Sequence, residues 1–162
     1  MRRSCAQLGI AGEDLSVVDS EKLPDGFHLW PEDVVAAHVA TFVEARGGDL
    51  VLTFDSGGVS GHPNHVSTSS GVLRARKESL ARGGFADVLM LETLGLQTKY
   101  LGPASLLLGV EEGASACTCR NPLASISAMT VHWSQFVWYR ALFAVFSRYA
   151  YVNTYLPPPD AA

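Results

Sequence analysis

The sequence predicts an α/β fold in which helices cover a mostly parallel β-sheet. Residues 50–54 and 88–92 are short apolar runs, typical of strands that are buried on both faces. One helix-like segment precedes the first run, and a second, residues 62–82, lies between the two runs. Strands that alternate with helices form parallel sheets, and ligands bind at the carboxyl ends of such strands. We therefore expect a functional site in the turn that follows Phe54.

The N-terminal part of the chain predicts two short elements and a loop. Residues 4–8 have the pattern of a helix end that stops at Gly9. The β-branched run at residues 15–19 predicts a short strand, and the Pro-Asp-Gly sequence at residues 24–26 predicts a loop. Because a helix already ends so close to residue 1, we expect that the chain begins inside a fold.

The two longer helices have recognisable boundaries. The first opens after Trp30 with a proline and two acidic residues, and it ends at Gly47 and Gly48. Its apolar side chains recur at helical spacing, which predicts one buried face. The second helix begins at His62 and runs to about Arg82, where two glycines follow.

The C-terminal part predicts less regular structure. Residues 106–110 are a candidate fourth strand, and residues 111–122 predict a loop. Residues 125–153 are rich in aromatic side chains, which fits either a buried helix with aromatic core packing or an element at a membrane surface. We assign residues 1–156 to one domain and residues 157–162 to a proline-rich tail.

The composition excludes several classes of protein. With 48% hydrophobic and 17% charged residues, the chain is too apolar to be disordered. Its net charge of -4 offers no basic surface, so we expect no nucleic-acid partner. The sequence contains no signal-peptide core and no run of about 18 apolar residues that would span a membrane. Cys5, Cys117 and Cys119 predict reduced thiols rather than a disulfide framework.

A pair of histidines marks the start of the second helix. His62 and His65 are three residues apart, so both imidazoles project from one side. Imidazole nitrogen is a common zinc ligand, and catalytic zinc has three protein ligands and a water. The glycine-rich turn at residues 55–61 allows the backbone to approach the site closely. However, the same spacing is common in proteins without a metal, and two histidines do not complete a zinc site.

Asp55, at the end of the first strand, has three candidate roles. It could bind a metal, cap the glycine-rich turn, or orient a histidine as a neighbouring carboxylate. We favour the capping or orienting role. Cys117 and Cys119 have only one residue between them, which is poor spacing for a tetrahedral metal site.

Two longer stretches carry a more specific pattern. Residues 53–65 read Thr-Phe-Asp-Ser-Gly-Gly-Val-Ser-Gly-His-Pro-Asn-His, and residues 128–149 contain Ala-Met, His-x-Ser-Gln, Trp-Tyr-Arg and Phe-Ser-Arg-Tyr. The first stretch resembles the second signature of the N-acetylglucosaminyl-phosphatidylinositol de-N-acetylases, the PIG-L members of the LmbE-like deacetylases. The second stretch resembles the same family independently, as do residues 4–10. The similarity therefore spans nearly the whole chain.

The resemblance implies a zinc-dependent hydrolase with a Rossmann-like three-layer fold. Members of the family remove the acetyl group from N-acetylglucosaminyl-phosphatidylinositol, the second step of GPI-anchor biosynthesis. They do so at the cytoplasmic face of the endoplasmic reticulum membrane. The expected partners are accordingly a glycolipid substrate and a membrane surface, and the expected cofactor is Zn²⁺.

The resemblance also implies roles for single residues. By position, His65 resembles the zinc-ligand histidine, and His62 resembles the histidine that stabilises the oxyanion or protonates the leaving amine. Both roles suit imidazole, because its ordinary pKa lies near neutral pH. We expect Asp55 to act in catalysis by orienting a histidine, and Ser60 and Asn64 to line the substrate pocket.

Two further candidates for substrate binding lie in the second matching stretch. His132 resembles a family position near the pocket, although it also fits an ordinary hydrogen-bonded helix residue. Arg140 is a candidate for contact with lipid phosphate.

One part of the family pattern does not occur in the sequence. The first signature, Ala-His-Pro-Asp-Asp-Glu, supplies two zinc ligands and the aspartate base, and these 162 residues contain no such stretch. We therefore expect an N-terminally truncated domain that lacks its first strand–helix unit and holds an incomplete zinc site. The alternative function is a catalytically inactive fragment or splice form that only binds substrate, a membrane surface or a partner.

Overall fold

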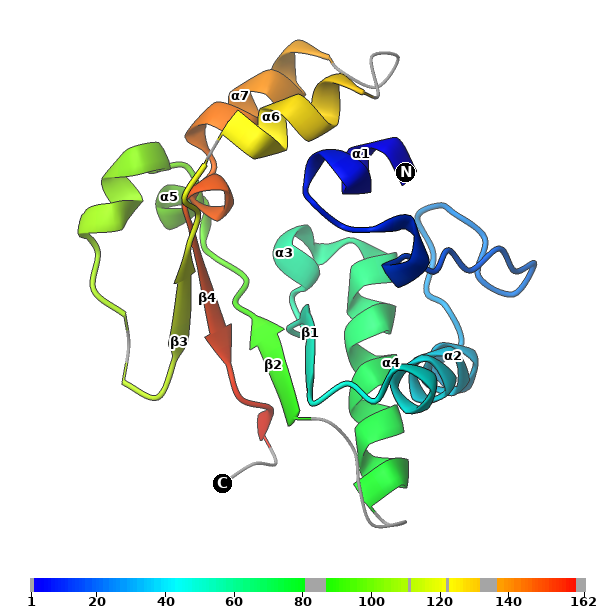
Figure 1. The fold of residues 1–162 in the computed structure, drawn as a ribbon. Helices are drawn as coiled ribbons and strands as arrows, with labels where there is room; N and C mark the ends of the chain where they lie inside the picture. Colours follow the sequence, from blue (N-terminus) through cyan, green and yellow to red (C-terminus); the bar gives the residue numbers. More distant parts are fainter. Residues whose placement is uncertain (1, 81–86, 111, 122, 132–136, 160–162) are drawn as a thin grey trace. The chain divides into compact units, whose positions relative to one another are not determined.

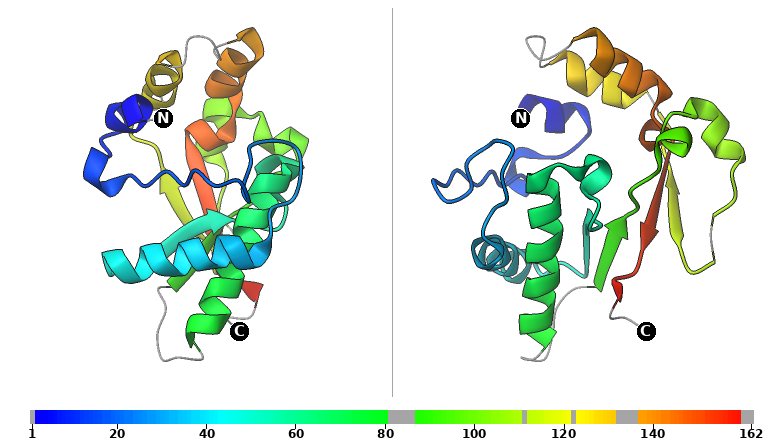
Figure 2. Two further views of the ribbon diagram at one scale, coloured as in Figure 1. Left: turned by 90° about the vertical axis from the view of Figure 1, so that its right-hand side faces the viewer. Right: turned by 180° about the vertical axis from the view of Figure 1, so that it is seen from behind.

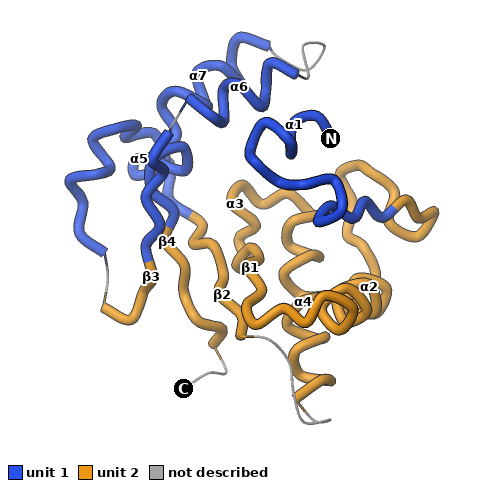
Figure 3. The backbone as a smooth tube through the Cα atoms, in the orientation of Figure 1, with its two compact units in different colours: residues 1–18, 94–110, 116–153 blue, residues 19–93, 111–115, 154–162 orange. Residues whose placement is uncertain are grey.

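The computed structural model describes residues 2–80, 87–110, 112–121, 123–131 and 137–159. The chain forms two compact units that alternate along the sequence (Figure 3). Unit 1 comprises residues 1–18, 94–110 and 116–153, and unit 2 comprises residues 19–93, 111–115 and 154–162. Unit 2 contains the glycine-rich turn and both candidate histidines.

Unit 2 is built around two long helices and two strands. Helix α2 (Glu32–Arg46) begins after Pro31 and carries its two acidic residues in the first turn, where they complement the helix dipole. It ends at Gly47, which adopts the left-handed conformation. Helix α4 spans Pro63–Leu80. Strands β1 (Leu50–Phe54) and β2 (Asp87–Leu91) confirm the two predicted apolar runs as strands.

The core of unit 2 lies between these helices and strands. Strands β1 and β2 pair in parallel, with Val51 opposite Val88 and Thr53 opposite Met90. Alternate strand residues therefore share the face that α4 contacts. The core on this face consists of Val72, Val88 and Met90, with Val39, Val51 and Leu73 packed against them. Figures 1 and 2 show α2 and α4 together on one side of β1 and β2.

A glycine sets the distance between α2 and α4. A Cβ atom on Gly71 would lie 2.4 Å from Cγ1 of Val35 and 3.3 Å from the backbone nitrogen of Ala36. Both of these α2 residues are buried. The two helices can therefore cross this closely only because residue 71 has no side chain.

The described strands form one four-stranded sheet in the order β1-β2-β4-β3. Strand β4 spans Val152–Leu156 and pairs antiparallel with β2 through Met90–Leu156 and Leu91–Tyr155. Strand β3 spans Ser115–Thr118. The predicted α/β class is confirmed, and β1 and β2 form a parallel pair within this sheet.

Unit 1 contains the shorter helices. They are α1 (Arg2–Gln7), α5 (Leu96–Lys99), α6 (Leu123–Thr130) and α7 (Trp138–Phe146), with 3-10 turns η1 (Gly12–Asp14), η2 (Gly102–Leu107) and η4 (Arg148–Ala150). Helix α1 packs on α6, and Ser127 Oγ donates a 3.0 Å hydrogen bond to Gln7 Oε1. Within the described ranges, no helix is long and apolar enough to cross a membrane.

The structure corrects two predicted strands. Residues 15–19 form no strand, and Val17 and Val18 are about half exposed. A β-branched run becomes a strand only when a neighbouring strand supplies hydrogen-bond partners. The predicted strand at 106–110 overlaps η2 instead. That turn is stabilised by Ser105, whose Oγ donates a 2.6 Å hydrogen bond to the Gly102 carbonyl.

The C-terminal predictions also change. The expected loop at 111–122 contains β3, and Cys119 N–H donates a 2.7 Å hydrogen bond to the Tyr151 carbonyl within unit 1. The described part of the aromatic-rich segment 125–153 contributes to α6, α7, η4 and the start of β4, and residues 132–136 lie outside the described residues. Pairing between residues distant in sequence decides both outcomes, and a local pattern does not contain that information.

Candidate functional site

The site is built on the turn that joins β1 to α4. After Phe54, a single helical turn, α3 (Gly58–Gly61), leads to His62 in extended backbone and then to Pro63. Gly58 has a φ of 55° and Val59 a φ of 67°. Valine is β-branched and rarely adopts positive φ, so this conformation is strained and needs support from its neighbours.

The carboxylate of Asp55 supplies part of that support. Its Oδ1 accepts hydrogen bonds from Gly57 N–H at 3.0 Å and Gly58 N–H at 3.1 Å. Its Oδ2 accepts a hydrogen bond from Thr93 N–H at 2.6 Å, and the Thr93 hydroxyl donates to Oδ1. Among the described residues, Asp55 therefore bonds to the turn and to Thr93, two residues past β2, rather than to an imidazole.

Thr93 completes the support, and the sequence analysis missed it. Its Oγ1 also accepts a 2.8 Å hydrogen bond from the strained Val59 N–H. A Cβ atom on Gly57 would lie 2.7 Å from Thr93 Oγ1, so the turn fits against Thr93 only with glycine at position 57. The available signal was a threonine one residue past the predicted strand 88–92, at the same sheet edge as Asp55.

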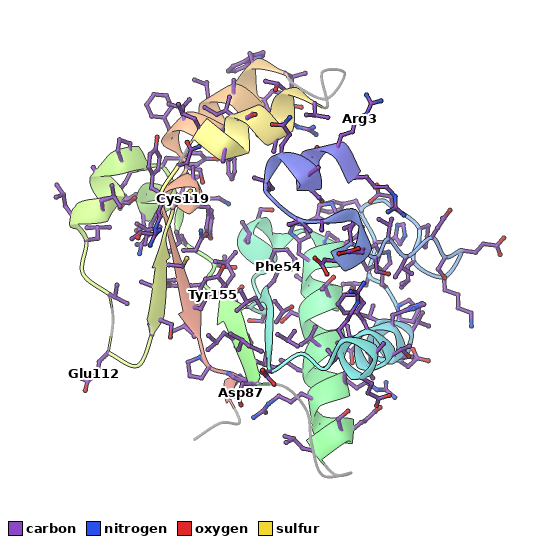
Figure 4. All side chains as sticks on the ribbon, viewed as in Figure 1. Arg3, Phe54, Asp87, Glu112, Cys119 and Tyr155 are labelled. Atoms are coloured by element: carbon purple, nitrogen blue, oxygen red, sulfur yellow. The ribbon has the colours of Figure 1, made fainter. Side chains whose placement is uncertain are left out.

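The hydrogen bond of His65 determines which of its ring nitrogens carries the proton. His65 Nδ1 lies 3.1 Å from the Gly58 carbonyl oxygen. Because a carbonyl can only accept, Nδ1 carries the proton and Nε2 keeps its lone pair. In metal-binding histidines, the ring nitrogen that does not bind the metal often donates a hydrogen bond to a backbone carbonyl. Nδ1 of His65 makes this kind of hydrogen bond. Phe54, labelled in Figure 4, stacks on the ring with centroids 4.3 Å apart and planes at 12°.

His62 has the opposite arrangement. Its Nδ1 accepts a 3.3 Å hydrogen bond from Asn64 N–H, so the proton of the neutral ring is on Nε2. Phe27 and this ring form a T-shaped pair, with centroids 5.4 Å apart and planes at 80°. The two imidazole centroids lie 5.1 Å apart. One turn thus presents a nitrogen donor and a nitrogen acceptor side by side.

The remaining predicted site residues fall into different places. Asn64 is buried, and its side-chain Oδ1 has no hydrogen-bond partner within the described part of the chain. Ser60 is exposed at the end of α3. Arg140 is partly buried in α7 of unit 1, and His132 lies outside the described residues. Phe27, in the loop before α2, is a further residue at the site that the sequence analysis missed.

The side chains near the two histidines supply one metal ligand and do not form a complete metal site. Among residues that the structure describes, no group of three His, Cys, Asp or Glu side chains could hold a metal ion. Both oxygens of Asp55 are used by the turn and by Thr93. These residues therefore provide a single suitable ligand atom, Nε2 of His65.

Comparison with known proteins gives the chain its family. No family model matches the sequence. The chain is 37% identical over 157 residues to the N-acetylglucosaminyl-phosphatidylinositol de-N-acetylase of Bos taurus, covering 94% of this chain and 61% of that protein. It is 30% identical over 183 residues to the probable enzyme of the same name from Dictyostelium discoideum, covering 93% of this chain and 71% of that protein. The chain belongs to the N-acetylglucosaminyl-phosphatidylinositol de-N-acetylase family.

Two further proteins are similar to the chain, one in sequence and one in fold. A probable de-N-acetylase from Schizosaccharomyces pombe is 26% identical over 84% of the chain. A crystal structure of a deacetylase triple mutant from the teicoplanin biosynthetic pathway matches 98% of this chain and 69% of its own with a TM-score of 0.53. At 17% sequence identity, that match supports the fold alone. The chain spans 61% of the length of the bovine de-N-acetylase.

Proposed function

We propose that the chain takes part in removing the acetyl group from N-acetylglucosaminyl-phosphatidylinositol. Its relatives carry this substrate in their names, and the histidine turn offers two groups that amide hydrolysis can use, a ring N–H donor on His62 and a ring nitrogen lone pair on His65. In this reaction a water oxygen bonds to the acetyl carbon, the C–N bond breaks, and a proton passes to the leaving nitrogen. The products are acetate and a free glucosamine amine.

The opposite hydrogen-bond roles of the two Nδ1 atoms support this proposal most directly. His62 presents Nε2–H, which can donate to the oxyanion as the carbonyl becomes tetrahedral and can then protonate the amine. His65 presents a bare Nε2, which suits a metal ligand. The different backbone partners of His62 and His65 thus suit one imidazole to proton donation and the other to metal binding.

The rest of the turn would hold these nitrogens in place. The Asp55–Thr93 hydrogen bonds stabilise the turn. Phe54 packs on the ring of His65 and Phe27 on the ring of His62, which restricts the motion of both rings. We place Ser60 and Asn64 at the substrate side of the turn. Preorganised donors accelerate reactions because they need not reorganise when charge develops.

We further propose Zn²⁺ as the metal, with His65 as one ligand and the others supplied from outside the described residues. When bound, zinc would polarise the acetyl carbonyl and activate a water. A substrate with a phosphatidylinositol anchor implies work at a membrane surface. We propose the cytoplasmic face of the endoplasmic reticulum membrane as the location, by analogy with the family.

The direct test is acetate release from N-acetylglucosaminyl-phosphatidylinositol by the 162-residue chain supplied with Zn²⁺. We expect release above the uncatalysed rate and a matching yield of free amine. A chain that binds the glycolipid but releases no acetate would contradict the enzymatic proposal. It would favour the alternative of a catalytically inactive binding fragment.

A further inference from the structure

Phe27 is an exposed aromatic side chain beside a candidate catalytic histidine. It lies in the loop before α2 and is 80% exposed. Its ring and the ring of His62 form a T-shaped pair, with centroids 5.4 Å apart. Single exposed apolar residues are common on protein surfaces, so exposure alone assigns Phe27 no role. Its place next to His62 distinguishes it, because a ligand bound at the histidine turn would meet this ring.

The loop that carries Phe27 is held in place by hydrogen bonds of Trp30. The backbone N–H of Trp30 donates a 2.9 Å hydrogen bond to Oγ of Ser67, a buried residue of α4. Its indole Nε1–H donates a 2.8 Å hydrogen bond to the Pro24 carbonyl, which joins the ends of the segment 24–30. Helix α4 also carries His65 near its start. The backbone that presents Phe27 is thus attached to the helix of the histidine site, and a preorganised group of this kind binds a ligand at little cost in ordering.

The exposed ring of Phe27 suits one class of ligand, a pyranose sugar. The face of a phenylalanine ring is the negative part of its quadrupole. The C–H groups of a pyranose form a flat apolar surface whose hydrogens carry a partial positive charge, so the two surfaces attract each other when they stack. Stacking also removes apolar area of both partners from water. Because Phe27 is 80% exposed, a face of its ring is open to this contact.

We propose that Phe27 is a stacking platform for the glucosamine ring of the substrate. In N-acetylglucosamine the acetamido nitrogen is attached directly to the pyranose ring, so a sugar stacked on Phe27 has its acetyl group close by. The Nε2–H of the neighbouring His62 is the donor that the proposed function directs at the acetyl oxygen. Phe27 thereby recognises the sugar part of the glycolipid and places its C–N bond at the histidine turn. This inference rests on the proposed function, because it names how the same site holds that substrate.

The proposal is tested by saturation-transfer NMR with the methyl glycoside of N-acetylglucosamine, a soluble sugar without the lipid. This measurement reads sugar binding and needs neither metal nor acetate release, so it is independent of turnover. We expect saturation to pass from aromatic protons of the chain to the ring C–H protons of the sugar. Phe27→Ala should weaken binding by about three- to tenfold, the size expected for one aromatic stacking contact. No transfer from the unchanged chain would overturn the proposal.

Further substitutions separate a ring face from mere apolar contact. Phe27→Trp keeps an aromatic face and should bind the sugar at least as tightly as the unchanged chain. Phe27→Leu keeps an apolar side chain against His62 but has no ring, so it should bind as weakly as Phe27→Ala. Leu29→Ala is the matched control, because Leu29 lies in the same loop and is 69% exposed. It should bind as the unchanged chain does, and equal loss in Leu29→Ala and Phe27→Ala would overturn the platform.

The acetate-release assay distinguishes stacking from a purely structural role of Phe27. A stacked sugar is held alike before and during the reaction, so Phe27→Leu should raise KM for the glycolipid and leave kcat nearly unchanged. A fall in kcat at unchanged KM would show that Phe27 only positions His62, and the platform would be wrong. If the chain releases acetate but sugar binding does not depend on Phe27, the platform fails and the proposed function stands. Sugar binding that depends on Phe27 without acetate release would support the platform and contradict the enzymatic proposal.

Discussion

Thr93 donates both its backbone N–H and its hydroxyl to the carboxylate of Asp55 across the ends of two neighbouring strands. The same hydroxyl accepts a hydrogen bond from Val59, whose positive φ is unfavourable for a β-branched residue. The histidine turn therefore has its conformation stabilised by a residue 34 positions further along the chain. This relationship links the packing of β1 and β2 to the position of both imidazoles.

Removal of the Thr93 hydroxyl should loosen the turn. Thr93→Val keeps the shape of the side chain but leaves Val59 N–H and Asp55 without that partner. We expect a loss of about 1–3 kcal/mol in the free energy of unfolding. Thr93→Ser keeps the hydroxyl and should retain most of the stability. Urea denaturation of the two variants measures the difference, and equal midpoints would show that the hydroxyl does not support the turn.

The space beside Thr93 gives an independent prediction. In Gly57→Ala the new Cβ atom would meet Thr93 Oγ1 at 2.7 Å, so the turn must shift at a cost of about 1–3 kcal/mol. Gly48→Ala is the control, because a Cβ atom there meets nothing within 4 Å. Thermal unfolding should show a clear decrease for Gly57→Ala only. A decrease of the same size in both variants would indicate a general effect of losing glycine.

The two histidines should differ in their effects on metal and on turnover. We expect the chain to bind Zn²⁺ weakly, since catalytic zinc has three protein ligands, and His65→Ala should weaken this binding further. His62→Ala should keep the metal affinity. In the acetate-release assay with Zn²⁺, His62→Ala should lower kcat by about 10²–10³-fold, as expected for loss of an oxyanion donor.

Titration with Zn²⁺ and acetate release measure these two effects separately. His38→Ala is a matched control, because His38 is an exposed histidine of α2. It should change neither quantity. The reverse result, in which His62→Ala loses metal and His65→Ala keeps it, would exchange the two assigned roles.

Strand β1 should make the isolated chain prone to association. It stands at one end of the strand order, and its Leu50 and Leu52 are 50% and 56% exposed. An apolar edge strand offers backbone groups and side chains to another chain. Leu52→Lys should therefore reduce aggregation in light scattering without loss of β-structure in circular dichroism. If Leu80→Lys reduces aggregation equally, general charge rather than the strand edge is responsible.

Several features follow from the local sequence. Helices α2 and α4 have the expected starts, and Gly47 ends α2 as predicted. The apolar runs at β1 and β2 are strands, and the histidines lie in the turn after β1. These features are readable because helix caps, glycine stops and apolar runs act between residues close together in the chain.

The tertiary structure decided what depends on distant residues. Whether the run at 15–19 became a strand, and whether β4 formed at all, depended on pairing partners that no local pattern contains. Thr93 reaches the turn because parallel strands bring their carboxyl ends together. The sequence by itself determined that two histidines share one turn. Only the folded backbone, through Gly58 and Asn64, determined which of them presents a proton and which a lone pair.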